Sequence, residues 1–299
     1  MNRIALLLAV TLILAGRSAS AELVVFTCEP EWAELIREIA GDDMNTFSAT
    51  TARQDPHRLQ ARPSLIARVR QADLLVCTGA DLEVGWLPLL LRRAGNPRLL
   101  PGQPGHFIAS DHVRKLEIPS RIDRAGGDIH PQGNPHVHLD PRNLLRIADP
   151  LARRLAQLDP ARADHNLAGL ARFKETFRAH IKTWREKAMP LKSMVIITHH
   201  RSYSYLVNWL GIEVLDTIEP KPGIPPSSSH LTKLLRLMEA RAPKYILVTP
   251  YSNPKPASWL SERTDVAVIE LPYSVGREHT AATLFDLFDT SINLLLGPS

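Results

Sequence analysis

Residues 159–188 read DPARADHNLAGLARFKETFRAHIKTWREKA, and this stretch decides the fold. Asp159 can cap a helix, and Pro160 can occupy its first position. Apolar residues then recur every three or four positions, forming one stripe along a helix of about 40 Å. The stripe consists of Leu167, Leu170, Phe173, Phe177, Ile181 and Trp184. With Pro190 as its stop, such a helix is expected to join two lobes, although a surface helix of one domain would show a similar stripe.

The segments on both sides of this helix alternate between strand-like apolar runs and helical patterns. This alternation is typical of βαβ units in parallel sheets. The predicted strands are Leu23–Thr27, Met44–Ala49, Leu74–Thr78, Met194–Thr198, Glu213–Thr217, Tyr245–Thr249 and Val266–Leu271. The helical patterns include Glu31–Ile39, Ser64–Gln71, Pro141–Leu158, Ser202–Leu210 and Leu231–Ala240. We therefore predict an α/β fold with two lobes, each a parallel sheet flanked by helices, joined by a single long α-helix.

The length of the chain supports this division. Its 299 residues exceed the usual size of one domain, so two lobes with separate cores are expected. The predicted parts are an N-terminal lobe at 22–158, the connecting helix at 159–190 and a C-terminal lobe at 191–299.

Residues 1–21 have the features of a secretory signal peptide. Arg3 precedes the apolar run Ile4–Ala15, and small residues end the segment at Ala19-Ser20-Ala21. The run is shorter than the roughly 20 apolar residues that a membrane span needs. Cleavage after Ala21 would give a soluble periplasmic protein, and no cysteine directly follows that could carry a lipid. An N-terminal membrane anchor that is retained is the alternative.

The charge and cysteine content narrow the class of protein. Without the signal segment the net charge is near +3, and aromatic residues make up 6% of the chain, so nucleic acid is not an expected partner. We expect a monomer. Cys28 and Cys77 each follow a strand-like run and would meet if those strands are neighbours in a parallel sheet; two buried free thiols are the alternative.

Several histidines lie where parallel sheets bind ligands, beyond the carboxyl ends of strands. His57 follows the second predicted strand in Asp55-Pro56-His57, and His199 and His200 follow the strand Met194–Thr198. A third group, in residues 130–141, contains His130, His136, His138 and Asp140.

Neutral imidazole is a good zinc ligand, and three imidazoles form most of a tetrahedral site. Asp55 and Asp140 are candidate hydrogen-bond partners for the ring N–H groups. The remaining histidines are expected to be ordinary surface residues, namely His106, His112, His165, His180 and His230.

Three histidine motifs together resemble a known family. Asp55-Pro56-His57, Asn134-Pro135-His136-Val137-His138-Leu139-Asp140-Pro141 and His200-Arg201-Ser202-Tyr203-Ser204-Tyr205 are similar, in order and separation, to those of the zinc and manganese solute-binding proteins of ABC importers, the cluster A metal receptors. The similarity covers almost the whole mature chain. It implies two α/β lobes on one long helix, a metal held between the lobes, and delivery to a membrane permease.

The resemblance also implies a role for individual residues. His57, His136 and His200 match the three metal ligands, and His199 is the weaker choice for the third. His138 stands where relatives often carry an aromatic residue, so it could be a neighbour of the metal or a ligand in transit. His130 belongs to the nearest equivalent of the histidine-rich loop found in zinc receptors.

The fourth ligand is where this sequence departs from the family. Relatives often place a carboxylate in the last loop, where Tyr273 stands here. Glu270, Glu278, His279 or a water could complete the site. Three imidazoles without an assured carboxylate favour Zn²⁺ over Mn²⁺, although copper or nickel would also accept them.

Two other functions share these ligands. A periplasmic metal store or chaperone would need the same site as a receptor. A zinc-dependent hydrolase would need an open coordination position and a general base such as Glu270 or Glu278. The sequence has no H-E-x-x-H motif and no G-x-S-x-G motif, so an enzyme is not the expectation.

Overall fold

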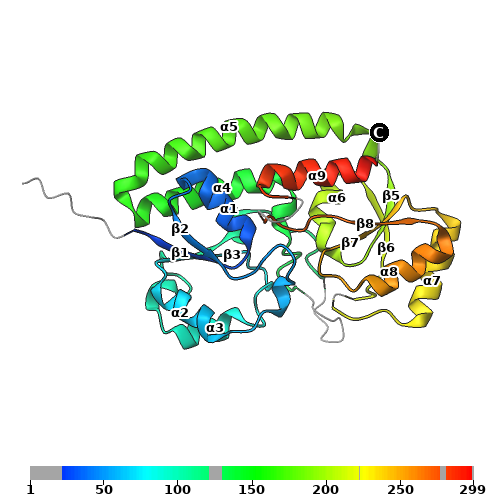
Figure 1. Ribbon diagram of the computed structural model, residues 1–299, viewed down its shortest axis with the longest axis horizontal. Coiled ribbons are helices and arrows are strands. Elements are labelled where there is room, and N and C mark those ends of the chain that lie inside the picture. Colours follow the sequence, from blue (N-terminus) through cyan, green and yellow to red (C-terminus); the bar gives the residue numbers. More distant parts are fainter. Residues whose placement is uncertain (1–21, 121–129, 222, 277–280, 298–299) are drawn as a thin grey trace, which may run out of the picture.

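The computed structural model describes residues 22–120, 130–221, 223–276 and 281–297. These residues form two four-stranded parallel sheets at opposite ends of the molecule (Figure 1). The first has the order β2-β1-β3-β4, from β1 (Val24–Thr27), β2 (Asn45–Ser48), β3 (Leu74–Cys77) and β4 (His106–Ile108). The second has the equivalent order β6-β5-β7-β8, from β5 (Val195–Thr198), β6 (Glu213–Thr217), β7 (Tyr245–Val248) and β8 (Ala267–Glu270). The predicted fold class is confirmed.

Helices cover both sheets. The first lobe has α1 (Pro30–Ala40), α2 (Pro63–Gln71), α3 (Leu87–Ala94) and α4 (Pro141–Leu158), and the second has α6 (Ser204–Leu210), α7 (Ser228–Ala240), α8 (Pro254–Thr264) and α9 (Leu284–Leu296). All seven predicted strands are present, within a few residues of their expected limits. Strand β4 was not predicted, because its three residues are too few for a period of two to show. No helix among the described ranges is long and apolar enough to cross a membrane.

The long helix α5 (Ala163–Lys187) runs beside both lobes (Figure 1). It packs on α4 and α1 of the first lobe and on α9 of the second. Its approach to α1 depends on Gly169, where an added Cβ would lie 1.9 Å from the carbonyl oxygen of Ile39. At its other end, the Trp184 indole N–H donates to Asp289 of α9 at 2.9 Å.

The start of this helix differs from the prediction. Pro160–Arg162 form a separate 3₁₀ turn, and α5 begins at Ala163. Asp159 makes no side-chain capping hydrogen bond, and its buried Oδ1 has no partner among the described residues. Leu167, predicted to belong to the apolar stripe, is 44% exposed, because the buried contact with α1 is made by Gly169 instead.

The expectation of two separate cores was wrong. One continuous apolar cluster extends from Trp32 and Leu151 in the first lobe, through Phe177 of α5, to Phe288 and Tyr205 in the second. Only the outer faces of the sheets have cores of their own, one beneath α2 and α3 and one beneath α7 and α8. Because α5 contributes buried side chains to the shared cluster, the two lobes are packed as one body.

Cys28 and Cys77 form a disulfide, so the predicted pairing is confirmed. Strands β1 and β3 are hydrogen-bonded neighbours with Thr27 beside Val76, which brings the next residues to a Cα separation of 4.8 Å. The bridge closes a loop with a sequence separation of 49. Restricting the unfolded chain in this way contributes about 4 kcal/mol to the free energy of unfolding.

Candidate metal centre

His57 is positioned by the turn that contains it. Asp55 caps the 3₁₀ turn Pro56–Arg58, and its Oδ1 accepts from the backbone N–H of His57 at 3.0 Å and lies 2.8 Å from the ring Nδ1. The Trp86 indole N–H donates to the carbonyl of Pro56 at 2.9 Å and holds the turn to the first lobe. One carboxylate therefore fixes both the backbone and the ring of His57, with Nε2 on the opposite side.

His136 is fully buried between the lobes. Its backbone N–H donates to the side chain of Asn134 at 3.0 Å. Its Nδ1 lies 2.7 Å from the hydroxyl of Tyr273, which follows β8 in the second lobe. Its Nε2 is buried and has no hydrogen-bond partner among the described residues. A buried nitrogen of this kind costs free energy unless a ligand satisfies it.

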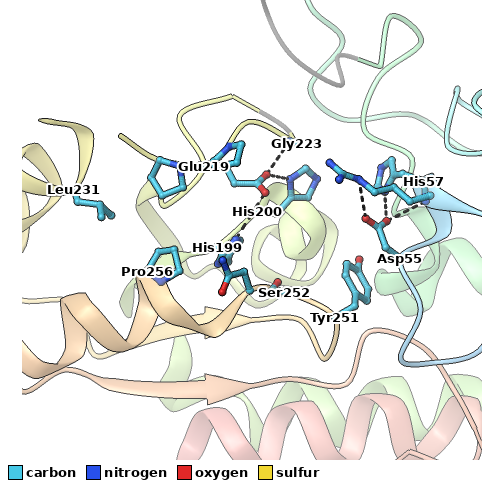
Figure 2. A pocket seen from close by; sticks show the side chains of 14 residues that line it. Asp55, His57, His199, His200, Glu219, Gly223, Leu231, Tyr251, Ser252 and Pro256 are labelled. Carbon is cyan, nitrogen blue, oxygen red and sulfur yellow. Dashed lines mark hydrogen bonds and ion pairs between the residues drawn. The ribbon is translucent and has the colours of Figure 1, made fainter. Parts of the chain in front are cut away.

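His200 lies just beyond β5, at the carboxyl end of the second sheet. Its Nδ1 is 2.7 Å from Oε2 of Glu219, which follows the neighbouring strand β6. The backbone N–H of Gly223 donates to the same oxygen at 2.9 Å. In Figure 2, dashed lines join the carboxylate of Glu219 to His200 and to Gly223, and on the other side of His200 Asp55 contacts His57. Glu219 was not among the predicted residues, although its place after a predicted strand could have indicated it.

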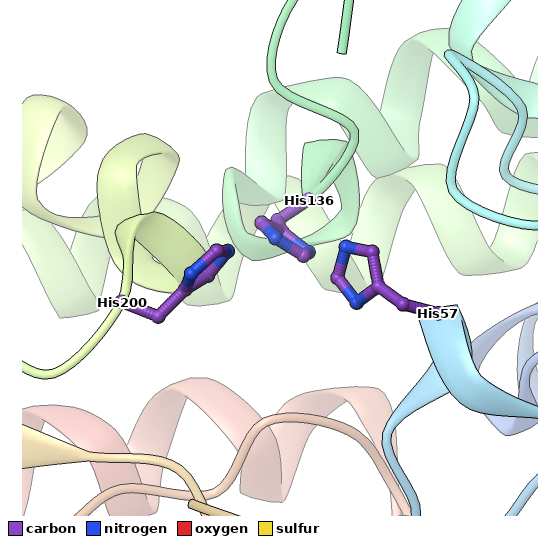
Figure 3. A group of neighbouring side chains, drawn as sticks. All are labelled: His57, His136 and His200. Carbon is purple, nitrogen blue, oxygen red and sulfur yellow. The ribbon is translucent and has the colours of Figure 1, made fainter. Parts of the chain in front are cut away.

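The three imidazoles converge on one point (Figure 3). One nitrogen from each of His57, His136 and His200 lies within 4.8 Å of the other two. The ring centroids are separated by 5.6, 5.7 and 5.9 Å, nearly an equilateral triangle. Since each Nδ1 already faces a partner behind its ring, the three Nε2 atoms are the nitrogens that face the centre. The structure thus brings together all three predicted principal ligands.

Electrostatics lower the pKa of His136 and of the two carboxylates that support its neighbours. Burial and the neighbouring His57 and His200 hold the pKa of His136 well below its usual value. Burial would raise the pKa of Asp55, but its hydrogen bond with His57 holds it below the usual range. The hydrogen bond with His200 similarly outweighs burial and lowers the pKa of Glu219. The two carboxylates Asp55 and Glu219, one behind His57 and one behind His200, can balance the charge of one divalent cation.

Tyr273 stands behind a candidate ligand rather than in front of it. Its hydroxyl contacts Nδ1 of His136, on the side of the ring opposite Nε2. A metal about 2 Å beyond Nε2 would be out of reach of this oxygen. Burial also raises the pKa of the Tyr273 phenol well above its usual value, which keeps it neutral.

Both nitrogens of His138 lie close to oxygen atoms of other residues. Nε2 lies 2.8 Å from the carbonyl of Tyr273, and Nδ1 lies 3.2 Å from Oε1 of Glu31. Glu31 in turn accepts from the hydroxyl of Ser274. His138 therefore lies between α1 and the loop after β8, and its nitrogens face Glu31 and Tyr273 rather than the three converging histidines.

The other predicted residues lie around the centre or away from it. His199 turns toward Glu219, with Nε2 3.8 Å from Oε1, and Glu270 is half-exposed and pairs with Arg53. Asp140, expected to support a histidine, instead caps α4 and pairs with Arg142, because it begins the helix. Glu278 and His279 lie outside the described residues.

The five histidines predicted to be ordinary surface residues take no part in the centre. Four of them contact backbone carbonyls and His112 stacks on a phenylalanine ring; they are His106, His112, His165, His180 and His230.

His130 lies directly beside the three converging histidines. Its Nε2 is 3.2 Å from Nε2 of His57, and burial together with His57 and His200 lowers its pKa to about 3. With His136 and His200 it lines a cavity of about 300 Å³. A second cavity of about 540 Å³ is lined by His57 and His200 together with Asp55 and Tyr251 (Figure 2).

Comparison with known proteins assigns the family. Residues 25–295 match the model of the zinc-uptake complex component A, periplasmic. The manganese ABC transporter substrate-binding lipoprotein PsaA of Streptococcus pneumoniae is 24% identical over 260 residues, covering 85% of this chain and 80% of that protein. The zinc-binding lipoprotein AdcA of S. pneumoniae serotype 4 is also 24% identical, covering 84% of this chain and 50% of its own length.

Solved structures show the same fold. The crystal structure of ZnuA superposes with a TM-score of 0.76 at 19% identity, covering 92% of this chain and 98% of that one. The Mn-bound periplasmic metal binding protein from Candidatus Liberibacter asiaticus gives 0.73 at 19% identity, covering 90% and 97%. The family consists of transport proteins and not enzymes. This chain therefore belongs to the periplasmic zinc-uptake component A family and is a metal-binding substrate-binding protein of an ABC importer.

Proposed function

We propose that the physiological cargo is Zn²⁺, that His57, His136 and His200 bind it through Nε2, and that the protein delivers it to its membrane permease. The observation that carries the proposal is that each Nδ1 is held by a partner 2.7 to 2.8 Å away, which aims each Nε2 inward. Such partners fix the tautomer and direction of a ligand ring before the metal arrives. The site is therefore organised for capture.

The type of ligand atom favours zinc over manganese. The named relatives include both a manganese and a zinc protein, so the family alone leaves the metal open. In this chain the carboxylates Asp55 and Glu219 lie behind rings rather than in the centre. Neutral imidazoles suit zinc, whereas manganese prefers oxygen ligands. Three nitrogens in the centre support the zinc assignment.

We expect the mature protein to start at Glu22 and to act as a monomer. The two lobes, 22–158 and 191–299, would both contact the permease, with the helix segment 159–190 on the opposite side. A metal store or chaperone would have the same ligands but no permease. Zinc-dependent growth of a strain that lacks the protein, restored by wild type but not by His136→Ala, would support the receptor.

Binding to the purified protein tests the site itself. The protein is stripped of metal and titrated with Zn²⁺ and, separately, with Mn²⁺, together with His57→Ala, His136→Ala, His200→Ala and the control His180→Ala. We expect one tightly bound Zn²⁺, weaker Mn²⁺, and losses of more than about tenfold in each triad variant but not in the control. Mn²⁺ bound as tightly as Zn²⁺ would refute the metal assignment, and unchanged affinity in a triad variant would remove that residue as a ligand.

A further inference from the structure

His130 and His57 face each other through their Nε2 atoms. Asp55 accepts from Nδ1 of His57, so Nε2 of a neutral His57 ring presents a lone pair. Nε2 of His130 faces this lone pair at 3.2 Å. Nearby, Nε2 of the fully buried His136 has no hydrogen-bond partner among the described residues. Ring nitrogens that gather in this way are suited to a shared cation.

The separation between His130 and His57 fits two ligands of a single tetrahedral ion. With metal–nitrogen bonds of about 2.0–2.1 Å, two ligand nitrogens of one ion lie about 3.3 Å apart and their ring centroids about 5.2 Å apart. His130 and His57 have 3.2 Å between Nε2 atoms and 5.2 Å between centroids. The centroid of His130 is 6.5 Å from that of His136, so its ring needs to tilt toward His136 to share an ion with it.

We propose that His130 is the fourth ligand, so that the cargo is held by four imidazoles. This inference rests on the proposed function of His57, His136 and His200. His130 would supply the ligand that relatives of this chain often provide as a carboxylate from the last loop, where this sequence has Tyr273.

The other described candidates for this position are already engaged. Tyr273 lies behind His136, and both nitrogens of His138 contact protein groups. His199 is turned toward Glu219, and Glu270 pairs with Arg53. Of these described candidates, His130 is the one whose nitrogen lies beside Nε2 of His57, and it shares a cavity with His136 and His200.

Four neutral nitrogens have a consequence for selectivity. A tetrahedral imidazole set is favourable for zinc and offers no oxygen to manganese, which prefers oxygen ligands and higher coordination. If a ligand nitrogen at this position were replaced by a carboxylate, the preference would shift toward manganese. His130 would therefore determine specificity as well as affinity.

Three variants of the full mature chain test the assignment, with Co²⁺ as the spectroscopic probe for Zn²⁺. His130→Ala should weaken Zn²⁺ binding roughly tenfold or more and change the visible absorption of the Co²⁺ form as one nitrogen is lost. His130→Asp should raise the affinity for Mn²⁺ relative to Zn²⁺, an effect that a purely structural role would not produce. His180→Ala is the control and should change neither measurement.

The outcomes separate this inference from the proposed function. If His130→Ala and His130→Asp both retain the wild-type spectrum and metal preference, His130 is not a ligand, even though the triad still binds. Two further variants, Glu278→Ala and His279→Ala, are measured in the same way. If the Co²⁺ spectrum changes in one of these and not in His130→Ala, the fourth ligand is that residue and the inference is overturned. If wild type binds no metal, or His57→Ala binds it normally, the proposed function itself fails.

Discussion

The hydroxyl of Tyr273 lies 2.7 Å from Nδ1 of His136, so a side chain of the second lobe orients a ring of the first that faces His57 and His200. The backbone carbonyl of the same tyrosine is 2.8 Å from Nε2 of His138, and the next residue, Ser274, donates to Glu31 of α1. The loop after β8 is therefore tied to the first lobe at three points. If His136 binds the metal as proposed, metal binding and the packing between the lobes are coupled through this loop.

Tyr273→Phe removes the hydroxyl while the ring can keep its packing. We expect a folded protein whose Zn²⁺ affinity is about 10- to 100-fold weaker, because Nδ1 of His136 loses the partner that fixes its tautomer. Competition with a zinc chelator of known affinity measures the change. Tyr245→Phe in β7 is the matched control. Equal affinity in both variants would mean that the Tyr273 hydroxyl does not support the ligand.

Glu219→Gln keeps the shape of the side chain behind His200 but removes its charge. The imidazole then becomes a weaker ligand and the site loses one of the two charges that balance a dication, so Zn²⁺ affinity should fall by about 10- to 100-fold. Glu213→Gln, at the far end of β6 in an exposed pair with Arg241, should leave affinity unchanged. Isothermal titration of both variants checks this. Identical affinities would show that Glu219 acts only in the local fold.

Gly169→Ala tests the contact between α5 and α1. Alanine normally favours a helix by about 1 kcal/mol over glycine, yet here its Cβ would lie 1.9 Å from the carbonyl oxygen of Ile39. We expect the variant to lower the free energy of unfolding by about 1–3 kcal/mol or more, as overpacking does. Ala168→Gly, at an exposed neighbouring position, should cost only about 1 kcal/mol. If Gly169→Ala is as stable as wild type in urea unfolding, α1 and α5 can move apart to accommodate the added methyl group without a loss of stability.

The carboxyls of Glu29 and Glu83 are buried together beside the disulfide and predict a pH dependence of stability. Burial raises the pKa of Glu83 to about 7, and burial together with Glu83 raises that of Glu29. Between the unfolded-state pKa near 4.5 and the folded-state value, the folded protein binds more protons than the unfolded chain. The free energy of unfolding should therefore decrease as pH rises through this window.

Glu83→Gln should flatten this decrease, since the amide mimics the protonated acid at every pH. The contribution of Glu83 amounts to up to about 3 kcal/mol across the window. Urea unfolding of metal-free protein from pH 4.5 to 7.5 measures it, with the exposed Glu175→Gln as control. Glu83 would not be the source of the pH dependence if the free energy of unfolding varied with pH equally in all three proteins. The same conclusion would follow if it varied in Glu83→Gln but not in wild type.

The sequence by itself determined the alternation of strands and helices, the long central helix and the three principal histidines. These features are local in the chain: a period of 3.6 or a short apolar run shows in adjacent residues, and His57 and His200 follow recognisable strands. The same locality explains the failures. The sequence did not distinguish a helix that starts at Ala163 from one that starts at Pro160. It also did not distinguish an Asp140 that caps α4 from one that supports a histidine ring.

Only the tertiary structure decided which side chains support the ligands and how the two lobes are joined. Glu219 reaches His200, and Tyr273 reaches His136 from 137 residues away. The apolar cluster that unites the lobes also exists only once α5 packs on α1 and α9. Such contacts depend on how elements distant in the chain pack against one another. The spacing of apolar residues within one helix or strand does not indicate which other element it will contact. The position of His130 beside His57 was decided in the same way.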